Sequence, residues 1–554
     1  MDRASTRRGL KRPLAAALIA ALAVVHSHGL AAQPAPSAQA QIAAAVAAEG
    51  QGSARDHGAA QALRALYAGS ANVPLWSHDG RATSQAQALL GELQHADAYG
   101  LQTRDYSADA IATLMSTPAT SAVADVKLTA ATLRFISDLH YGRVDPAAAG
   151  FNLQASRQQL DLAATLAALT RASDVIAGVA AIEPPFHHYK LLKDALTRYL
   201  KLAQHTELAQ LPAAPAGLKP GGSYTGAPAL RRLLLALGDL PASAGEASTQ
   251  PTFDEPLSLG VRAFQQRLGL ATDGVLGKAT FAALTTPPAQ RVRQIDLTLE
   301  RWRWLPPFQT PPIIVNIPQF RLFAFRTTED RVADILQMDV IVGRVFPRMQ
   351  TPVFESDMRY VVIRPYWDVP YSITKNEMLP KIRANPGYLA AQRLQIVGGQ
   401  QDSSPVLAPT PQNIDALAAG QLRLRQLPGE DNALGLIKFI FPNSYNVYLH
   451  STPAHQLFKE SRRAFSHGCI RVSEPLALAT QVLAGAPGDW SRQKIEAAMN
   501  GDATSLRINL PQPINVLILY GTALATEAGP TLFFDDIYGY DSKLERQLGL
   551  VPIR

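Results

Sequence analysis

The hydrophobic pattern changes near the middle of the chain, and this change constrains the fold more than any other feature. Up to about residue 205, Ala-rich segments such as 59–67 and 126–136 repeat apolar residues at helical spacing. Beyond residue 307 the apolar runs are short, rich in β-branched and aromatic residues, and bounded by Pro, Gly or charge, which predicts strands. These runs are 311–317, 321–325, 338–343 and 360–364. Because the chain has 554 residues, 47% of them hydrophobic, we expect a multidomain α+β protein with several cores.

The two halves predict different domains. The mainly helical N-terminal half predicts a scaffold domain at 33–210. The repeated short strands favour a sandwich or a barrel over a parallel sheet, and of the two we expect a β-sandwich-like domain at 295–545. Between residues 375 and 436 the strand pattern lapses into proline-rich helix-and-loop sequence. We therefore expect an insertion at 376–435. It either forms a lid over a binding groove or is a passive decoration, and the sequence leaves both readings open.

A Pro- and Gly-rich linker at 211–228 separates the helical half from a compact unit. In this unit Val261, Phe264 and Leu268 fall on one helical face, and Asp273 with Gly274 forms a turn signal before a further helix. The unit resembles the small three-helix peptidoglycan-binding module, placed here at 227–288, in the order Phe264-Gln265, Gly269-Leu270, Asp273-Gly274, Gly277, Thr280 and Leu284. The alternative is a plain helical spacer.

The N-terminus is typical of a secretory signal. Cationic residues at 3, 7, 8, 11 and 12 precede an apolar run at 13–25 and small residues at 31 and 32, so we expect a signal peptide at 1–32. The apolar run is shorter than the roughly 20 residues of a bilayer span, which disfavours an uncleaved anchor. Much of the net charge of +7 lies in this segment, and the remaining charge of about +3 is too small to argue for nucleic acid.

The chain contains one cysteine, Cys469, within the sequence SHGCIR at 466–471, so no intramolecular disulfide can form. A thiol attacks carbonyls as the thiolate, and its ordinary pKa of about 8.5 leaves only a few per cent charged at neutral pH. His450, which ends an apolar strand, can act as the base. With no carboxylate nearby in sequence, the carbonyl of Ser451 is the expected partner that orients the imidazole. The N–H groups of Gly468 and Cys469 are candidates for an oxyanion hole.

Two other readings of these residues remain open at this point. A single cysteine is often a buried hydrophobic residue, and a histidine at a strand end is often structural. A zinc site built from Cys469 with His450, His455 and His467 lacks the paired spacing of familiar zinc ligands, so no metal is expected.

His450, followed after a short gap by Ser466, His467, Gly468 and Cys469, resembles the signature of L,D-transpeptidases of the YkuD fold. Arg471 and the length of the chain resemble the large periplasmic branch of that family. Further segments of agreement are 142–146, 342–344, 351–352, 365–370, 384–388 and 535–539. Two positions depart from the family pattern. Ser451 stands where an acidic residue or glycine is common, and Gly521 stands where a tryptophan is expected.

This resemblance implies a periplasmic enzyme that joins two peptidoglycan tetrapeptide stems, one as donor and one as acceptor. Cys469 would form a thioester and His450 would move the protons, without a metal or organic cofactor. Carbapenem β-lactams would acylate Cys469, and other cell-wall enzymes are candidate partners. The implied substrate contacts are Tyr448, Trp367, Ser466, His467 and Arg471. Two alternatives remain: an L,D-carboxypeptidase that hydrolyses the same thioester, and a catalytically silent wall-binding scaffold.

Overall fold

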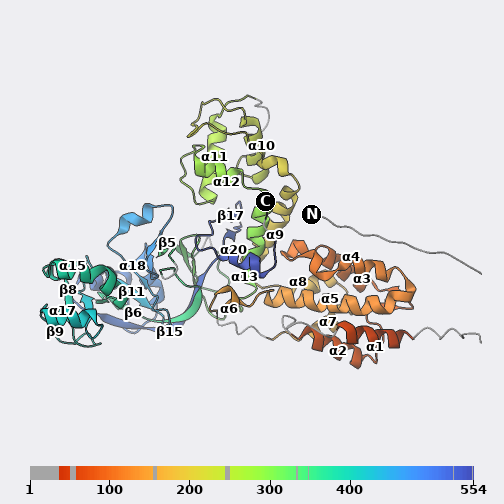
Figure 1. Cartoon of the computed structure of the whole chain (residues 1–554), viewed down its shortest axis with the longest axis horizontal. Coiled ribbons are helices and arrows are strands. Elements are labelled where there is room, and N and C mark those ends of the chain that lie inside the picture. Colours follow the sequence, from red (N-terminus) through yellow and green to blue (C-terminus); the bar gives the residue numbers. More distant parts are fainter. Residues whose placement is uncertain are drawn as a thin grey trace, which may run out of the picture.

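The computed structural model describes residues 37–49, 58–153, 159–241, 243, 250–331, 335–346, 349–527, 529–551 and 553. The expected signal peptide at 1–32 lies outside these residues. Within them, no helix combines the length and apolar character that crossing a bilayer requires. In Figure 1 the first helices lie at one end of the molecule and the strand-rich part lies at the other. A small helical unit, in yellow and green, projects from the region between them.

The N-terminal half is helical, as predicted. Helix α5 (Ser121–Tyr141) runs through its centre, and the other helices pack around it. The Asp125 carboxylate of α5 accepts a hydrogen bond from the Tyr67 hydroxyl at 2.6 Å and others from the backbone N–H groups of Leu75 and Trp76, both at 2.8 Å. These bonds fasten the loop after α2 to α5. The surrounding helices are α1 (Ala38–Glu49), α2 (Ala59–Gly69), α3 (Ser84–Gln94), α4 (Ala108–Met115), α7 (Leu162–Leu169) and α8 (Val175–Ala180).

Helix α9 (His187–Ala203) packs against α13 (Pro288–Trp302) and strands near the C-terminus, and it also contacts η1 (Ala96–Tyr99) of the N-terminal half. The loop after α5 is tied to the end of α13, because Glu300 accepts hydrogen bonds from the backbone N–H groups of Arg143 and Val144. Gly142 has φ +78°, and a side chain there would collide with Glu300 and Trp304. The glycine of this segment therefore allows the two parts of the chain to approach closely.

The small helical unit consists of α10 (Ala227–Leu237), α11 (Glu255–Arg267) and α12 (Lys278–Leu284), and it confirms the predicted three helices. Val261 and Phe264 are buried in its core. Asp254 caps α11 by accepting a hydrogen bond from the N–H of Leu257 at 3.0 Å. Gln265 of α11 donates to Asp273 at 2.8 Å and so holds the turn that leads into α12.

Among the described residues, the strand-rich part forms a nine-stranded sheet in the order β13-β5-β14-β12-β11-β6-β15-β3-β4, and β4 also pairs with β5. The extra pairing closes the sheet, so the domain is barrel-like, and the expectation of a β-sandwich is corrected. Strand β15 bends at a register shift between Asn509 and Ile514, where two prolines cannot donate ladder hydrogen bonds. The strands are β3 (Ile313–Asn316), β4 (Arg321–Ala324), β5 (Leu336–Gly343), β6 (Phe354–Ile363), β11 (Ile437–Ile440), β12 (Leu449–His450), β13 (Ala464–Ser466), β14 (Ile470–Val472) and β15 (Leu506–Leu519).

Residues 367–426 form a separate unit with its own hydrophobic cluster, which includes Ile382, Ile396 and Leu424. Its four-stranded sheet has the order β7-β10-β8-β9, formed by β7 (Trp367–Asp368), β8 (Leu394–Val397), β9 (Val406–Leu407) and β10 (Arg423–Gln426). The helix-and-loop prediction missed these strands, each four residues or shorter, because so short a run carries little periodic signal. The helical elements are α14 (Tyr371–Ile373), η7 (Thr374–Met378), α15 (Leu379–Ala384), α16 (Tyr388–Ala391) and α17 (Pro411–Ala418).

Candidate active site

Strands β12 and β14 run parallel, and their register brings the candidate residues together. Leu449 pairs with Ile470, and His450 pairs with Arg471. Leu449 and Ile470 are both fully buried in the core of the barrel. Since side chains alternate along a strand, the neighbouring residues point to the opposite face. Tyr448, His450, Cys469 and Arg471 therefore share one face of the sheet.

The His450 imidazole is buried and oriented by a backbone carbonyl. Nδ1 lies 2.5 Å from the carbonyl oxygen of Ser451, the group expected from the sequence. Nδ1 therefore carries the hydrogen that is donated, which leaves the lone pair on Nε2. The backbone of Leu434 also interacts with the ring. Burial, and then the Arg471 cation, lower the pKa of His450 to about 3. The imidazole is neutral at physiological pH and can accept a proton.

The Cys469 thiol is half-buried, and its Sγ lies 3.6 Å from the carbonyl oxygen of Asn446. Burial raises the pKa of the thiol above its ordinary value. Hydrogen bonds from the backbone and hydroxyl of Tyr448, and then the charge of Arg471, oppose this rise but do not cancel it. The resting thiol is therefore protonated. Tyr448, expected as a substrate contact, lies against the sulfur, and its ring centroid is 5.8 Å from that of His450.

Hydrogen bonds within the turn before Cys469 correct the expected oxyanion hole. The Gly468 N–H donates to Ser466 Oγ at 3.1 Å, so it is not available to a substrate. Ser466 Oγ in turn donates to the Cys469 carbonyl at 2.6 Å. Ser466 is 3% exposed, so it holds the turn and does not face a substrate as expected. In the part of the chain that the structure describes, the Cys469 N–H donates to no acceptor and remains the candidate donor.

Thr351, in the segment between β5 and β6, supports this turn and was not among the predicted site residues. Its Oγ1 accepts a hydrogen bond from the Gly343 N–H and donates to the Gly468 carbonyl, both at 2.8 Å. Because Thr351 is fully buried, its hydroxyl is satisfied by these two protein partners and not by bulk water. The segments at 342–344 and 351–352 agree with the family pattern in sequence, but their contact with Gly468 depends on the tertiary fold.

His467 and Trp367 lie toward the 367–426 unit. His467 Nε2 is 2.6 Å from Glu377 Oε1 of η7, a residue that the sequence did not single out. Trp367 packs on the hydrophobic cluster of that unit. Its neighbour Asp368 is close enough to raise the pKa of Tyr448, after burial and Cys469. Strand β7 therefore borders the face that carries Cys469.

Arg471 carries a charge that no protein carboxylate neutralises. Among the described residues it forms no ion pair, and its buried Nε has no hydrogen-bond partner. Burial, and then the nearby Arg344 cation, lower its pKa. The face that presents the thiol is thus positively charged and suited to an anionic group. No group of three or more His, Cys, Asp or Glu residues within the described ranges could hold a metal ion.

Three stretches of the chain match models of known protein domains. Residues 311–489, which contain both strands of the site, match the model of the YkuD "L,D-transpeptidase catalytic domain". The chain contains a YkuD L,D-transpeptidase catalytic domain. Residues 226–284 match a "Putative peptidoglycan binding domain", so the module is not a plain spacer, and residues 61–196 match a "Scaffold domain".

A curated protein matches about half of the chain. A Haemophilus influenzae protein named "Putative L,D-transpeptidase" is 33% identical over 269 residues, which cover 49% of this chain and 51% of that protein. The chain thus aligns with about half the length of this curated relative.

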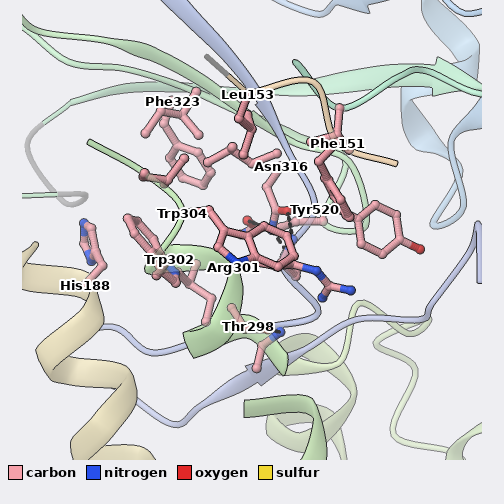
Figure 2. A pocket seen from close by; sticks show the side chains of 18 of the residues that line it. Phe151, Leu153, His188, Thr298, Arg301, Trp302, Trp304, Asn316, Phe323 and Tyr520 are labelled. Carbon is pink, nitrogen blue, oxygen red and sulfur yellow. Dashed lines mark hydrogen bonds between the residues drawn. The ribbon is translucent and has the colours of Figure 1, made fainter. Parts of the chain in front are cut away.

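An apolar pocket lies apart from the thiol of the YkuD domain. It is lined by Trp302, Trp304, Phe323, Tyr520 and other residues, with about 720 Å³ of space between atoms, part of it open to solvent. Figure 2 shows these rings around the pocket, and no residue of 466–471 reaches it. Gly521, which stands in place of the expected tryptophan, forms part of its wall. This departure therefore affects the boundary with α13 and leaves the Cys469 face intact.

The pKa shifts predict an unusual pH dependence for alkylation of the YkuD thiol. Because the thiol pKa is raised, the rate of reaction with iodoacetamide should still increase above pH 9 in the free protein. Removing the Arg471 cation by Arg471→Leu should shift this profile to higher pH, since the cation favours the thiolate. The chain has one cysteine, so intact mass reports on Cys469 alone. A rate that reaches a plateau below pH 8 would indicate a preformed thiolate–imidazolium pair and contradict this account.

Proposed function

We propose that the protein is a peptidoglycan L,D-transpeptidase that makes 3→3 crosslinks between peptide stems through a thioester on Cys469. The observation that carries the proposal is the parallel pairing of β12 and β14, which puts the neutral His450 imidazole and the Cys469 thiol on one face of the YkuD domain. The peptidoglycan-binding domain in the same chain supports peptidoglycan as the substrate. The site of action is then the cell envelope, with the segment at 1–32 directing export to the periplasm.

In the first step, His450 Nε2 accepts the thiol proton while Sγ attacks the carbonyl carbon of the third residue of the donor stem. Because the pKa of His450 is about 3 and that of the thiol is raised, proton transfer accompanies attack and does not precede it. The Cys469 N–H stabilises the negative oxygen of the tetrahedral intermediate. The bond to the terminal D-alanine then breaks, His450 returns the proton to the leaving amine, and the thioester remains.

In the second step, the side-chain amine of the acceptor stem attacks the thioester carbonyl. His450 takes a proton from the amine and returns one to the departing sulfur, which restores the thiol. One amide bond is broken and one is formed, so no cofactor is needed. Arg471 and the nearby Arg344 would bind stem carboxylates, and Tyr448, Trp367 and His467 would line the substrate groove.

Product analysis tests this function. The purified protein is incubated with tetrapeptide muropeptides, and the products are separated by mass. Both reactions release D-alanine, but transfer predicts crosslinked dimers, whereas a carboxypeptidase gives tripeptide without dimers. Cys469→Ala should make neither product and should form no carbapenem adduct, while it retains wall binding. Dimers from Cys469→Ala would rule out the cysteine mechanism. A wild-type protein that binds the wall but makes no product would instead support the catalytically silent scaffold.

We also propose that the 367–426 unit acts as a lid over the Cys469 groove. The contact between Glu377 of η7 and His467, two residues before the thiol, supports this proposal. Because both side chains are partly exposed, this contact is worth roughly 0.2–1 kcal/mol, which suits a contact that opens and closes.

Breaking this contact should loosen the lid selectively. Glu377→Ala is expected to increase hydrogen–deuterium exchange of residues 371–391 and to raise KM about two- to five-fold. Glu430→Ala serves as the matched control, because Glu430 is an exposed glutamate in the same region. Equal exchange in the wild type and both variants would refute the lid contact.

A further inference from the structure

A second large crevice lies between the peptidoglycan-binding domain and the C-terminal segment, far along the chain from the Cys469 motif. It has about 1420 Å³ of space between its walls, part of it open to solvent. One wall is α12 with the loop before it, the floor is the first half of α13, and the opposite wall is residues 533–545. None of the residues on the Cys469 face lines it. The crevice is therefore separate from the catalytic groove.

Strong polar contacts hold the two walls in place. Arg267, at the end of α11, makes a buried bidentate ion pair with Asp239, with both N–O distances 2.7 Å. The same guanidinium donates from Nη1 to the carbonyl of Thr531 at 3.2 Å, which joins the peptidoglycan-binding domain to the C-terminal segment. Gln294 of α13 donates to the carbonyl of Phe534 at 3.2 Å. The crevice is thus formed before any ligand arrives.

Arg291 of α13 lines this crevice, and the Asp535 carboxylate on the opposite wall acts on its charge without direct contact. Its Nη1 donates to the side-chain oxygen of Gln294 at 2.8 Å and its Nη2 to the carbonyl of Ala283 at 3.4 Å, and both partners are neutral. The guanidinium also lies 4.9 Å from the centre of the Phe533 ring. Over the described ranges, no carboxylate forms an ion pair with it. Burial is the main cause that lowers the pKa of Arg291 to about 10, and the Arg267 cation acts in the same direction. Tyr199 and Asp535 oppose this shift.

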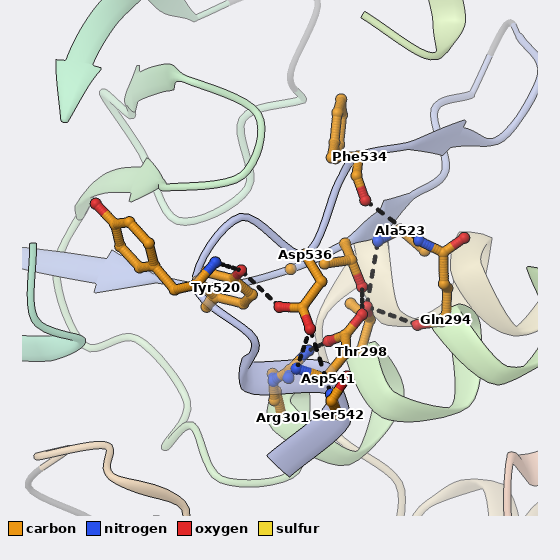
Figure 3. A network of polar contacts seen from close by, with 12 residues as sticks. Gln294, Thr298, Arg301, Tyr520, Ala523, Phe534, Asp536, Asp541 and Ser542 are labelled. Atoms are coloured by element: carbon orange, nitrogen blue, oxygen red, sulfur yellow. Dashed lines mark hydrogen bonds and ion pairs between the residues drawn. The ribbon is translucent and has the colours of Figure 1, made fainter. Parts of the chain in front are cut away.

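The carboxylates of the opposite wall are occupied elsewhere, as Figure 3 shows for two of them. Asp536 accepts hydrogen bonds from the Tyr520 hydroxyl and from backbone N–H groups of α20 (Tyr540–Gln547), and Asp541 pairs with Arg301 at 2.6 Å. Glu545 lies 3.5 Å from Arg293. Asp535 is different, because it is exposed on the crevice wall and its side chain has no partner in the described part of the chain.

We infer that this crevice is a second peptide-stem site, in which Arg291 binds a carboxylate of the stem and Asp535 binds an amine. The inference rests on the proposed function, which makes stems carrying both groups the substrate. A guanidinium without an anionic partner gains most from a carboxylate, since it can donate two parallel hydrogen bonds. Because Arg291 follows the matched peptidoglycan-binding domain and the other wall lies near the C-terminus, that domain alone would lack half of this site.

Hydrogen–deuterium exchange of the full chain with Cys469→Ala, with and without the free tetrapeptide stem, tests the inference. We expect the stem to protect residues 279–294 and 533–545, separately from protection around residues 446–471. Arg291→Gln should weaken binding of the stem at the crevice about 10- to 100-fold. It should remove the protection of residues 279–294 and 533–545 and leave that around residues 446–471 unchanged. Arg232→Gln is the matched control, because Arg232 is exposed on α10 of the same domain and does not line the crevice. A stem with amidated carboxylates should not protect the crevice.

The outcomes separate this inference from the proposed function. If the stem protects residues 446–471 but not the crevice, or if Arg291→Gln and Arg232→Gln behave alike, the second site is refuted. If residues 446–471 are not protected and the wild type makes no product, the proposed function fails instead. Ala282→Glu provides a second variant in case Arg291→Gln unfolds, because Ala282 is exposed on α12 and the added carboxylate would repel the stem.

Discussion

Replacing His450 with glutamine is expected to lower kcat/KM for crosslinking by about 10²- to 10⁴-fold, the usual contribution of a positioned acid–base group. The amide of glutamine can still donate to the Ser451 carbonyl, so the buried site keeps its hydrogen bond. It cannot accept the thiol proton or return it to the leaving amine. The loss should appear both in the rate of muropeptide crosslinking and in the rate at which a carbapenem acylates Cys469, followed by intact mass.

His467→Gln is the matched control for this prediction. It removes an imidazole two residues before the thiol, but His467 is partly exposed and its ring contacts Glu377. We expect a loss no greater than that of Glu377→Ala, two- to five-fold. A similar loss from both histidine variants would mean that His467 shares the proton transfer. Full activity of His450→Gln would remove the general base from the mechanism.

His450 and Cys469 could be singled out from the sequence because both residues lie in short local motifs of a recognisable family. The Ser451 carbonyl followed from the absence of a neighbouring carboxylate, and the structure has a hydrogen bond there. The fold class was predicted more coarsely. Local patterns identified helices in the N-terminal half and strands after residue 307, but they carry no information about which distant strands pair. The closure through β4 and β5 was therefore missed.

The remaining differences arise from contacts that only the tertiary fold creates. Gly468 N–H was expected to face the substrate, but the fold turns it toward Ser466 Oγ. Thr351 and Glu377 come from other elements and meet the 466–471 motif only after folding. Arg291 is one arginine among many in the sequence. Its significance depends on the lack of a carboxylate partner within the described residues, which no pattern along the chain could predict.

The second large effect is expected at Gly343, which supports the active site through backbone contacts. A Cβ atom on Gly343 would lie 1.9 Å from the Met349 carbonyl oxygen and 2.7 Å from the Thr351 N. Both are backbone atoms, so no side-chain rotation can relieve the overlap. Gly343→Ala must therefore displace the segment that carries Thr351, and with it the hydrogen bond to the Gly468 carbonyl. We expect the catalytic domain to lose at least about 3 kcal/mol of unfolding free energy, measured from its denaturant transition.

Gly521→Ala is the matched control, because it adds the same methyl group at a position where the structure has room for it. The added Cβ would lie 3.4 Å from Thr298 Cγ2 and 3.6 Å from Asn316 Oδ1, which are ordinary contacts, and the glycine does not have a positive φ. We expect stability to change by less than about 1 kcal/mol, since alanine also restricts the unfolded chain. Carbapenem acylation of Cys469 should be slowed in Gly343→Ala and unchanged in Gly521→Ala. If both variants were equally stable and equally active, the Gly343–Thr351–Gly468 connection would not position the nucleophile.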